Sequence, residues 1–281
     1  MTVPDITLND QTTIPQLGFG VYQVPPADTE STVLQALEVG YRHIDTAQMY
    51  QNEAGVGAAI KGSGIARGDL YVTTKLNNNR HRPDDAKASL AESLEKLGLD
   101  AVDLFLIHWP LPTQYDGDYV STWKALIDLQ TEGLTTSIGV SNFQPAHIDR
   151  IVEETGIVPA VNQIEAHPYL TNEVARLATL KHGATVEAWS PIAQGAVLDD
   201  PAIRQIADKY GKTPSQVTLR WHIERGDVVF PKTMHRSRME ENFAIFDFSL
   251  EPGEVEAISA LDKGEAGRTG PNPDTFDWVP R

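Results

Sequence analysis

Amphipathic helical stretches and short β-branched runs alternate along most of this chain. In the first complete unit, a helical stretch carries Val33 and Leu37 on one face, and we expect Asp28 to cap its start and Gly40 to end it. A short apolar run follows and closes on a polar residue, Asp45. Because this order of helix, glycine, strand and polar residue recurs along the chain, the pattern predicts a series of βα units.

Eight strands are predicted, at residues 17–20, 42–44, 70–74, 102–107, 137–140, 160–162, 185–188 and 228–231. This alternation indicates a closed parallel (β/α)8 barrel, the TIM barrel, formed by one domain over residues 1–281. Two β-like pieces within residues 6–15 predict a hairpin before the barrel, and helical patterns occupy 202–210 and 214–224. After a last helical piece at 254–261, we expect a Gly/Pro-rich tail near the active-site mouth.

An open, doubly wound sheet is the alternative fold, and it would carry a glycine-rich turn after its first strand. Gly55 and Gly57 resemble part of such a dinucleotide fingerprint, but Ile60 stands where the third glycine belongs. The segment also lies inside a predicted helix, so close helix packing is the better interpretation of these glycines.

Composition and charge exclude several classes of function. The 23 basic and 39 acidic residues give a net charge of −16, which argues against binding to nucleic acid or to an anionic membrane. With no cysteine, the chain has no disulfide, thiolate nucleophile or zinc–thiolate site. No signal peptide or membrane span is recognisable, and we expect a cytoplasmic monomer.

Polar residues close most of the predicted strands. In a barrel of this kind the active site lies at the carboxyl ends of the strands, so these side chains would converge on one mouth. Taken singly, each could be a helix cap, a solvated strand end or a structural histidine, but their joint occurrence indicates a site. The residues are Asp45, Lys75, His108, Asn142, Gln163, Trp189 and Lys232.

Five segments carry a resemblance to a known family. They are Gly-Tyr-Arg-His-Ile-Asp-Thr-Ala at 40–47 with Tyr50, Asn52 and Glu53, Leu-Ile-His-Trp-Pro at 106–110, Ile-Gly-Val-Ser-Asn-Phe at 138–143, Asn-Gln at 162–163, and Pro-Lys-Thr at 231–233. In order and spacing, from about residue 6 to 262, the chain resembles the aldo-keto reductases, and among them the bacterial 2,5-diketo-D-gluconate reductases. The resemblance implies a barrel, NADPH as cofactor and reversible reduction of carbonyl groups.

The same resemblance implies roles for four side chains. Tyr50 would be the general acid, and a free phenol, with a pKa of about 10, donates a proton poorly near neutrality. We expect the Lys75 ammonium to lower that pKa, and Asp45 to hold Lys75 charged. His108 would hydrogen-bond the carbonyl oxygen and orient the substrate.

Further residues match the family's cofactor ligands. Ser141, Asn142 and Gln163 would bind the nicotinamide carboxamide, and Trp189 would stack on the nicotinamide ring. The segment from Ser190 to Gly195 would be flexible and cover the pyrophosphate.

A basic turn after the last strand matches the site for the 2′-phosphate of NADP. Cations beside a helix start make an anion site, and Ser237 with Glu240 is expected to form a capping box there. Glu241 and Asn242 would reach the adenine. Relatives often carry a basic residue at position 235, so the histidine here predicts a weaker or pH-dependent NADPH preference. The proposed ligands in the turn are Lys232, Thr233, His235 and Arg238.

The substrate pocket is where this chain departs from its relatives. Tyr22, Met49 and Trp109 are expected to form its walls, with Phe276 or Trp278 from the tail. Position 77 is Asn77, where relatives often carry a tryptophan that lines the pocket, so specificity for a diketogluconate does not follow from the resemblance. The expected substrates are aldehydes or ketones such as small dicarbonyls or keto-sugars.

Two other functions fit parts of the pattern. Lys75 at a strand end could form a Schiff base, as in class I aldolases. A non-enzymatic NADP-binding regulatory protein would share the fold. A metal hydrolase is not expected, because His43, Asp45, His108 and His167 lack the spacing of metal ligands.

Overall fold

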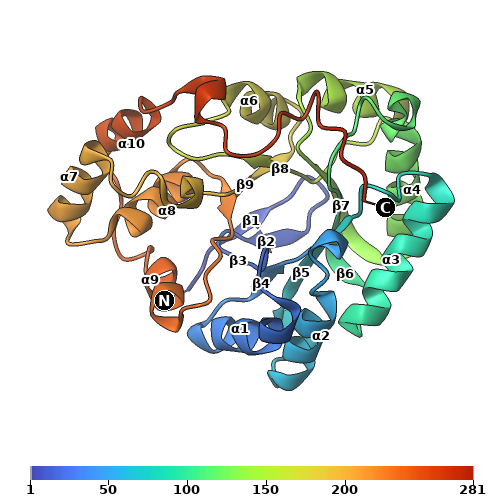
Figure 1. Cartoon of the computed structure of the whole chain (residues 1–281), viewed down its shortest axis with the longest axis horizontal. Coiled ribbons are helices and arrows are strands. Elements are labelled where there is room, and N and C mark those ends of the chain that lie inside the picture. The colour runs from blue at the N-terminus through green and yellow to red at the C-terminus, as the bar shows by residue number, and fades with distance from the viewer. Residues whose placement is uncertain (1, 281) are drawn as a thin grey trace.

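The computed structural model describes residues 2–280, and its centre is a parallel barrel of eight strands (Figure 1). Each strand pairs in parallel with the next along the chain. Backbone bonds from Gly18 N to Val229 O (2.7 Å) and from Val229 N to Gln16 O (3.0 Å) join the last strand to the first. The predicted closed barrel is therefore confirmed. Its strands are β3 (Phe19–Gly20), β4 (His43–Asp45), β5 (Tyr71–Leu76), β6 (Val102–Ile107), β7 (Thr135–Ser141), β8 (Val161–Glu165), β9 (Thr185–Trp189) and β10 (Val228–Val229).

Helices surround the strands on all sides in Figure 1. Strand residues that point outward, such as Ile44, Phe105 and Val140, are buried against them in the main apolar core. The connection between β9 and β10 holds two helices, as predicted. The helices are α1 (Pro26–Val39), α2 (Glu53–Gly62), α3 (Pro83–Leu97), α4 (Tyr119–Thr131), α5 (Pro145–Thr155), α6 (Glu173–Lys181), α7 (Pro201–Tyr210), α8 (Pro214–Glu224), α9 (Arg236–Phe243) and α10 (Pro252–Ser259).

The interior of the barrel is apolar at one end and polar at the other. The predicted hairpin, β1 (Asp5–Thr7) with β2 (Thr13–Pro15), is antiparallel, and Leu8 and Ile14 beside it pack with Leu104, Leu106 and Val161 inside the barrel. The hairpin therefore closes the amino end of the barrel with hydrocarbon. Side chains that bear charge are left to the carboxyl end of the strands.

Strand register decides which polar side chains become neighbours at that end. Asp45 lies beside Thr73 in the sheet, and Gln163 lies beside Ser141 on one strand and Glu187 on the other. Because side chains alternate between the two faces of a strand, residues two apart face the same side. Asp45, Lys75, Gln163 and Glu187 therefore share the interior.

The structure corrects two predicted helix caps. Helix α1 begins at Pro26 after Pro25, so Asp28 lies within its first turn, where a carboxylate still suits the helix dipole. Helix α9 begins at Arg236 with His235 preceding it, and no side chain caps it. Glu240 accepts a hydrogen bond from Arg236 Nε (3.0 Å) instead of closing a capping box with Ser237, since the ion pair is available one turn away.

The described residues include no helix long and apolar enough to cross a membrane.

Two glycines of α2 permit close packing, as their sequence context suggests. A Cβ on Gly57 would lie 2.4 Å from the carbonyl oxygen of Leu97, and a Cβ on Gly55 would lie 2.7 Å from Cβ of Thr29. Both glycines have helical backbone, so their role here is to admit α3 and α1 at short range.

Gly57→Ala is therefore expected to lower the free energy of unfolding by about 1–3 kcal/mol, since the new methyl group meets backbone that cannot move aside easily. Urea denaturation would measure this loss. Gly68→Ala is the matched control, because a Cβ there meets no atom within 4 Å. Equal stability of the two variants would contradict the packing role.

Candidate active site

Lys75 on β5 is the buried cation at the centre of the polar interior. Its side chain is completely buried, and Nζ donates to Asp45 Oδ1 (2.7 Å), Asp45 Oδ2 (2.9 Å) and Thr46 O (2.9 Å). The Asp45 carboxylate is almost as buried as the ammonium. The ion pair predicted from the sequence is present, and every close partner of the ammonium is an oxygen.

Tyr50 stands above this pair. It closes a short 3-10 turn, η1 (Gln48–Tyr50), that follows β4, and its hydroxyl lies 3.5 Å from Lys75 Nζ. The His108 ring, at the end of β6, lies edge-on to the Tyr50 ring, with centroids 5.7 Å apart. His108 is buried, and its Nδ1 has no hydrogen-bond partner among residues 2–280. Four predicted side chains thus meet at one point.

Burial sets the proton affinities of Tyr50 and His108. Desolvation raises the pKa of Tyr50 well above 10, and the negative charge of Asp45 and the neighbouring Tyr22 add to this. The net direction is therefore opposite to the lowering expected from Lys75, because burial is the largest cause of the shift. Burial, with Lys75 nearby, lowers the pKa of His108 well below 6.5. Near neutrality the phenol is protonated and the imidazole is uncharged.

Gln163 links this group to an acid that the sequence analysis did not select. Its Nε2 donates to Asp45 Oδ2 (2.9 Å) and to Glu187 Oε2 (2.7 Å). Glu187 is completely buried, and burial followed by the charge of Asp45 raises its pKa to about 8. An acid in a β-branched run two residues before Trp189, on the same face of the strand, was the signal that could have identified it.

Asn142 connects three strand ends. It has a left-handed backbone (φ 65°) just after β7, and its Nδ2 donates to His108 O (2.9 Å). Its Oδ1 accepts from Trp189 Nε1 (2.8 Å), so the amide fixes the indole of Trp189. Ser141 Oγ donates to the backbone oxygen of Gln163 (2.8 Å). These expected cofactor ligands are gathered at one side of the mouth and tied to each other.

The segment after Trp189 has an irregular backbone. Ser190 (φ 51°), Ala193 (φ 48°), Gln194 (φ 53°) and Gly195 (φ 98°) all lie in the left-handed region, which only glycine adopts without cost. A 3-10 turn, η4 (Ala193–Gly195), forms part of it. Backbone strain of this kind is typical of segments that contact ligands.

The basic turn lies between β10 and α9. Lys232, His235 and Arg238 are exposed, and none of them forms an ion pair with another described residue. Arg236 differs, because it pairs with Glu38 and with Glu240. Thr233 is buried, and its Oγ1 accepts a hydrogen bond from His235 N (3.1 Å). The turn therefore presents two cations, Lys232 and Arg238, and one imidazole, His235, without ion-pair partners among the described residues.

Two side chains expected at the adenine have partners within the protein. Glu241 Oε1 accepts from Thr213 Oγ1 (2.8 Å), and Asn242 Oδ1 accepts from Ser215 Oγ (2.8 Å). Asn242 is buried, whereas Glu241 is partly exposed.

Residues expected in the substrate pocket line the rim around Tyr50. The ring of Tyr22 is exposed and lies 5.0 Å from the Tyr50 ring. Trp109 packs against Phe276 of the tail, with ring centroids 4.3 Å apart. Asn78 Nδ2 holds the carbonyl of Trp278 (2.9 Å), beside Asn77. The tail therefore reaches the mouth, as predicted, and Figure 1 shows it crossing from α10 towards α4. Met49 precedes Tyr50 in η1 and is partly exposed.

A second acid missed from the sequence anchors the tail. Glu165 at the end of β8 is completely buried. Its Oε1 accepts from His167 Nε2 (3.1 Å) and from the backbone N and Oγ1 of Thr269 (each 2.6 Å), and its Oε2 accepts from Gly270 N (3.0 Å). These bonds lower the pKa of Glu165, although burial opposes them. A Cβ on Gly270 would lie 2.4 Å from the Trp189 ring, so the tail presses on the indole.

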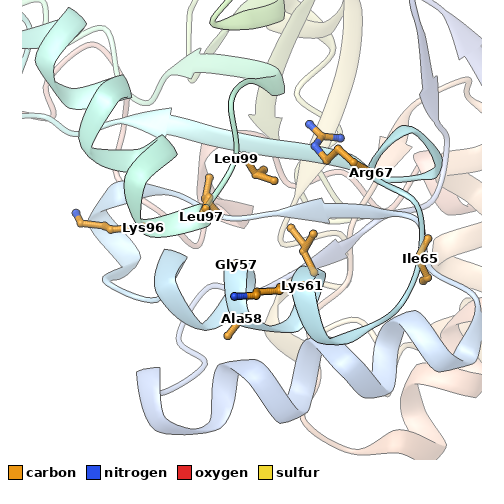
Figure 2. Close-up of a pocket in the computed structure, with 10 residues that line it drawn as sticks. Gly57, Ala58, Lys61, Ile65, Arg67, Lys96, Leu97 and Leu99 are labelled. Carbon is orange, nitrogen blue, oxygen red and sulfur yellow. The ribbon is translucent and has the colours of Figure 1, made fainter.

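The pocket drawn in Figure 2 is separate from this group. It has a volume of about 430 Å³ and lies between α2 and the end of α3, where Lys61, Arg67 and Lys96 surround apolar side chains. None of the predicted site residues lines it. Residues 2–280 also contain no cluster of three or more His, Asp or Glu side chains that could hold a metal ion.

A parallel barrel with a tyrosine, a histidine and a buried lysine–aspartate pair at the carboxyl ends of its strands has the proton donor and the polarising groups of a carbonyl oxidoreductase. The profile of the Aldo/keto reductase family matches residues 16–263. The chain belongs to the aldo/keto reductase family, so the predicted class of enzyme is confirmed.

Relatives cover almost the whole chain. An aldo-keto reductase of Mycolicibacterium smegmatis is 48% identical over 98% of this chain and 99% of its own length. Methylglyoxal reductase DkgA of Escherichia coli is 48% identical over 96% and 97%. The crystal structure of a Bombyx mori aldo-keto reductase in complex with NADP has a TM-score of 0.87 and 39% identity, covering 94% of each chain. A Gox0644 mutant in complex with NADPH has a TM-score of 0.94 and 40% identity, over 99% of this chain and 100% of its own.

Lys75→Met is expected to lower the free energy of unfolding by about 3–5 kcal/mol, because Asp45 would remain buried without its cation. Chemical denaturation at neutral pH would measure the loss. Lys61→Met, at an exposed lysine of α2, is the matched control and is expected to change stability by less than about 0.5 kcal/mol. If both variants had wild-type stability, the ion pair would not support the fold.

Proposed function

We propose that this chain reduces the carbonyl group of a small aldehyde or ketone with NADPH, and that Tyr50 is the general acid. The observation that carries the proposal is the meeting of Tyr50, Lys75, Asp45 and His108 at one point of the barrel mouth, with the Tyr50 hydroxyl 3.5 Å from Lys75 Nζ. Relatives of high coverage and similar fold bind NADPH or NADP. We therefore assign the same cofactor here.

The residues around the mouth fit such a cofactor. Both N–H groups of Gln163 Nε2 are taken by Asp45 and Glu187, which leaves Oε1 to accept from the carboxamide of the nicotinamide. The Trp189 indole is held at its Nε1 by Asn142 and is partly exposed, so its ring is available for stacking. Lys232, His235 and Arg238 suit the 2′-phosphate, since their charges are not used within the protein.

When bound, NADPH supplies the hydride that adds to the carbonyl carbon. The protein handles the oxygen: Tyr50 gives its phenolic proton to that oxygen as negative charge develops on it. Because the phenol has a raised pKa, it is fully protonated before reaction, and the Lys75 ammonium then stabilises the phenolate that forms. His108, uncharged, would donate a hydrogen bond to the same oxygen and orient the substrate.

Asp45 acts through Lys75 rather than on the substrate. It accepts two of the three close hydrogen bonds of the ammonium and keeps that charge aimed below Tyr50. The arrangement disfavours a Schiff-base aldolase, because a nucleophilic lysine has to be uncharged, whereas Lys75 is bonded to a carboxylate and a carbonyl oxygen. Trapping of a substrate on Lys75 by borohydride would overturn the reductase mechanism.

For the substrate, we propose small 2-oxoaldehydes and related dicarbonyls, with keto-sugars as a second class. The relatives named as methylglyoxal reductases support this choice. The rim includes Asn77 next to the tail, and an amide there can hydrogen-bond a second oxygen of the substrate. A panel of methylglyoxal, diketones and keto-sugars, followed by NADPH absorbance, would rank them by kcat/KM. A lack of turnover on the whole panel with intact NADPH binding would instead favour a regulatory, non-enzymatic role.

Tyr50→Phe is expected to lower kcat by at least about 10²–10⁴-fold while NADPH still binds, because the variant lacks only the acidic proton. Tyr210→Phe, which removes a hydroxyl bonded to Glu254 on the surface, is the matched control for loss of a phenol. Steady-state kinetics and calorimetric titration of NADPH would give the two quantities. Near-normal turnover of the Tyr50 variant would remove it as the acid.

Lys232→Met is expected to lower kcat/KM for NADPH roughly tenfold and to leave the value for NADH almost unchanged, since only NADPH carries the 2′-phosphate. Arg236→Met is the matched control, because that guanidinium is already paired with Glu38 and Glu240. Equal losses with the two cofactors would place Lys232 outside the 2′-phosphate site.

A further inference from the structure

Glu187 is an acid that the proposed reaction does not use directly. It lies on β9, fully buried in the barrel interior, and its Oε2 accepts from Gln163 Nε2 at 2.7 Å. Its Oε1 is buried and has no hydrogen-bond partner within residues 2–280. An acid side chain in such a place is costly to bury, so a role that compensates for the cost is expected.

The register of the sheet makes Glu187 the direct neighbour of Gln163. On the other side of the amide, Asp45 Oδ2 accepts the second N–H at 2.9 Å. A primary amide has two N–H donors and one carbonyl acceptor. With both donors held by carboxyl groups, the amide cannot turn over without leaving an acid unpaired, and its acceptor end is fixed.

We propose that Glu187 is a positioning residue for the cofactor: together with Asp45 it locks the amide of Gln163, so that Gln163 Oε1 is presented to the carboxamide of the nicotinamide. This inference rests on the proposed function, because it assigns Gln163 to the cofactor. The carboxamide N–H needs an acceptor, and an amide free to flip would offer N–H donors for part of the time. A flipped amide would turn Oε1 towards the Asp45 carboxylate, which can only accept, and would lose the N–H bond to Glu187 Oε2, so the two acids together disfavour that alternative.

The protonation of Glu187 follows from what faces it. The charged or titratable groups near it are Asp45 on β4 and Lys75 and Tyr71 on β5, while its neighbours on β8 and β10 are the uncharged Gln163 and Val228. Asp45 and burial favour the protonated acid, and its pKa is raised from 4.5 to about 8. In that form the proton belongs on Oε1, which faces no hydrogen-bond partner within residues 2–280, and Oε2 remains an acceptor for Gln163.

The test compares two replacements of Glu187. Glu187→Gln keeps a carbonyl oxygen that can accept from Gln163, so its dissociation constant for NADP⁺ is expected to match that of the wild type. Glu187→Leu has no acceptor and is expected to weaken NADP⁺ binding roughly tenfold, the size of one lost hydrogen bond. Glu53→Leu is the matched control, since it removes another buried glutamate, which accepts from Thr74 Oγ1 (2.7 Å) on the helix side of the barrel. Calorimetric titration would give the constants.

The interpretation is checked in a second background. In Gln163→Leu, addition of Glu187→Leu is expected to have no further effect on NADP⁺ binding, because the amide that Glu187 positions is gone. The double variant removes Gln163 and Glu187 together and leaves Asp45 with Lys75, so it avoids the unsatisfied Gln163 N–H that Glu187→Leu alone creates. Equal weakening by Glu187→Leu in both backgrounds, or equal weakening by Glu53→Leu, would overturn the positioning role.

A readout on the protein without cofactor separates this inference from the proposed function. Between pH 4.5 and about 8 the folded chain keeps a proton on Glu187 that the unfolded chain has released, so this group's contribution to stability is present below pH 4.5 and is lost as pH rises to about 8. The unfolding temperature of Glu187→Gln is therefore expected to rise relative to that of the wild type as the pH increases from 5 to 9. A constant difference would overturn the protonated state assigned to Glu187, and the positioning role is then decided by the binding constants of Glu187→Leu and Glu53→Leu. If wild-type protein does not bind NADP⁺, the proposed function fails instead.

Discussion

The ammonium of Lys75 is the charge that the polar half of the barrel is arranged to hold. An isolated ammonium of this burial would cost several kcal/mol, and only a set of well-placed oxygens makes it tolerable. Asp45 and the carbonyl of Thr46 provide them on one side, and the phenol of Tyr50 closes the other. Each of these groups is placed by the carboxyl end of β4 or the turn after it. The barrel therefore has to keep β4 and β5 in fixed register, and the same register fixes the position of the Tyr50 phenol.

Glu187 extends the same constraint across the barrel. Asp45 cannot be satisfied by Lys75 alone, and its Oδ2 is shared with Gln163, which reaches Glu187 on the far strands. A line of polar contacts thus runs from β5 through β4 to β8 and β9. At the opposite end of the barrel a hydrophobic cluster packs beside the hairpin, so water has little access to the line from that side. The low polarity of that cluster strengthens every electrostatic contact above it.

Most of the fold and the central part of the site could be predicted from the sequence. The helix–strand alternation predicted the barrel. The polar residues at the strand ends identified Asp45, Lys75 and His108 as site residues, because strand ends converge in this fold. Glu165 and Glu187 were not predicted as site residues because they lie inside or at the end of apolar runs, where only the strand register shows which side chains they face. The helix caps were misplaced by three residues at α1 and by two at α9, where the ion pair of Arg236 with Glu240 replaces the expected capping box.

The raised pKa of Tyr50 could not be inferred from neighbouring charges in the sequence. The presence of Lys75 predicted a lowered pKa for Tyr50. The direction of the shift depends mainly on how far the hydroxyl is buried, and burial is known only from the three-dimensional structure. The same holds for Asn142, whose amide binds within the protein to His108 and Trp189. Its type and position were correctly singled out, but the bonds that it makes depend on strands that are distant in sequence.

The tail both attaches to the barrel at Glu165 and contributes residues to the substrate rim, and different residues serve these two roles. The carboxylate holds the tail largely through backbone N–H groups of Thr269 and Gly270, which residues of almost any type could supply. Particular residues are demanded at Gly267 and Gly270, where a Cβ would meet Tyr169 O and the Trp189 ring, and at Thr269, whose hydroxyl also donates to Glu165. Phe276 and Trp278, which shape the rim, lie further along and take no part in the anchor. Substitutions at the rim residues can therefore change which molecules the site accepts while the tail remains attached to the barrel.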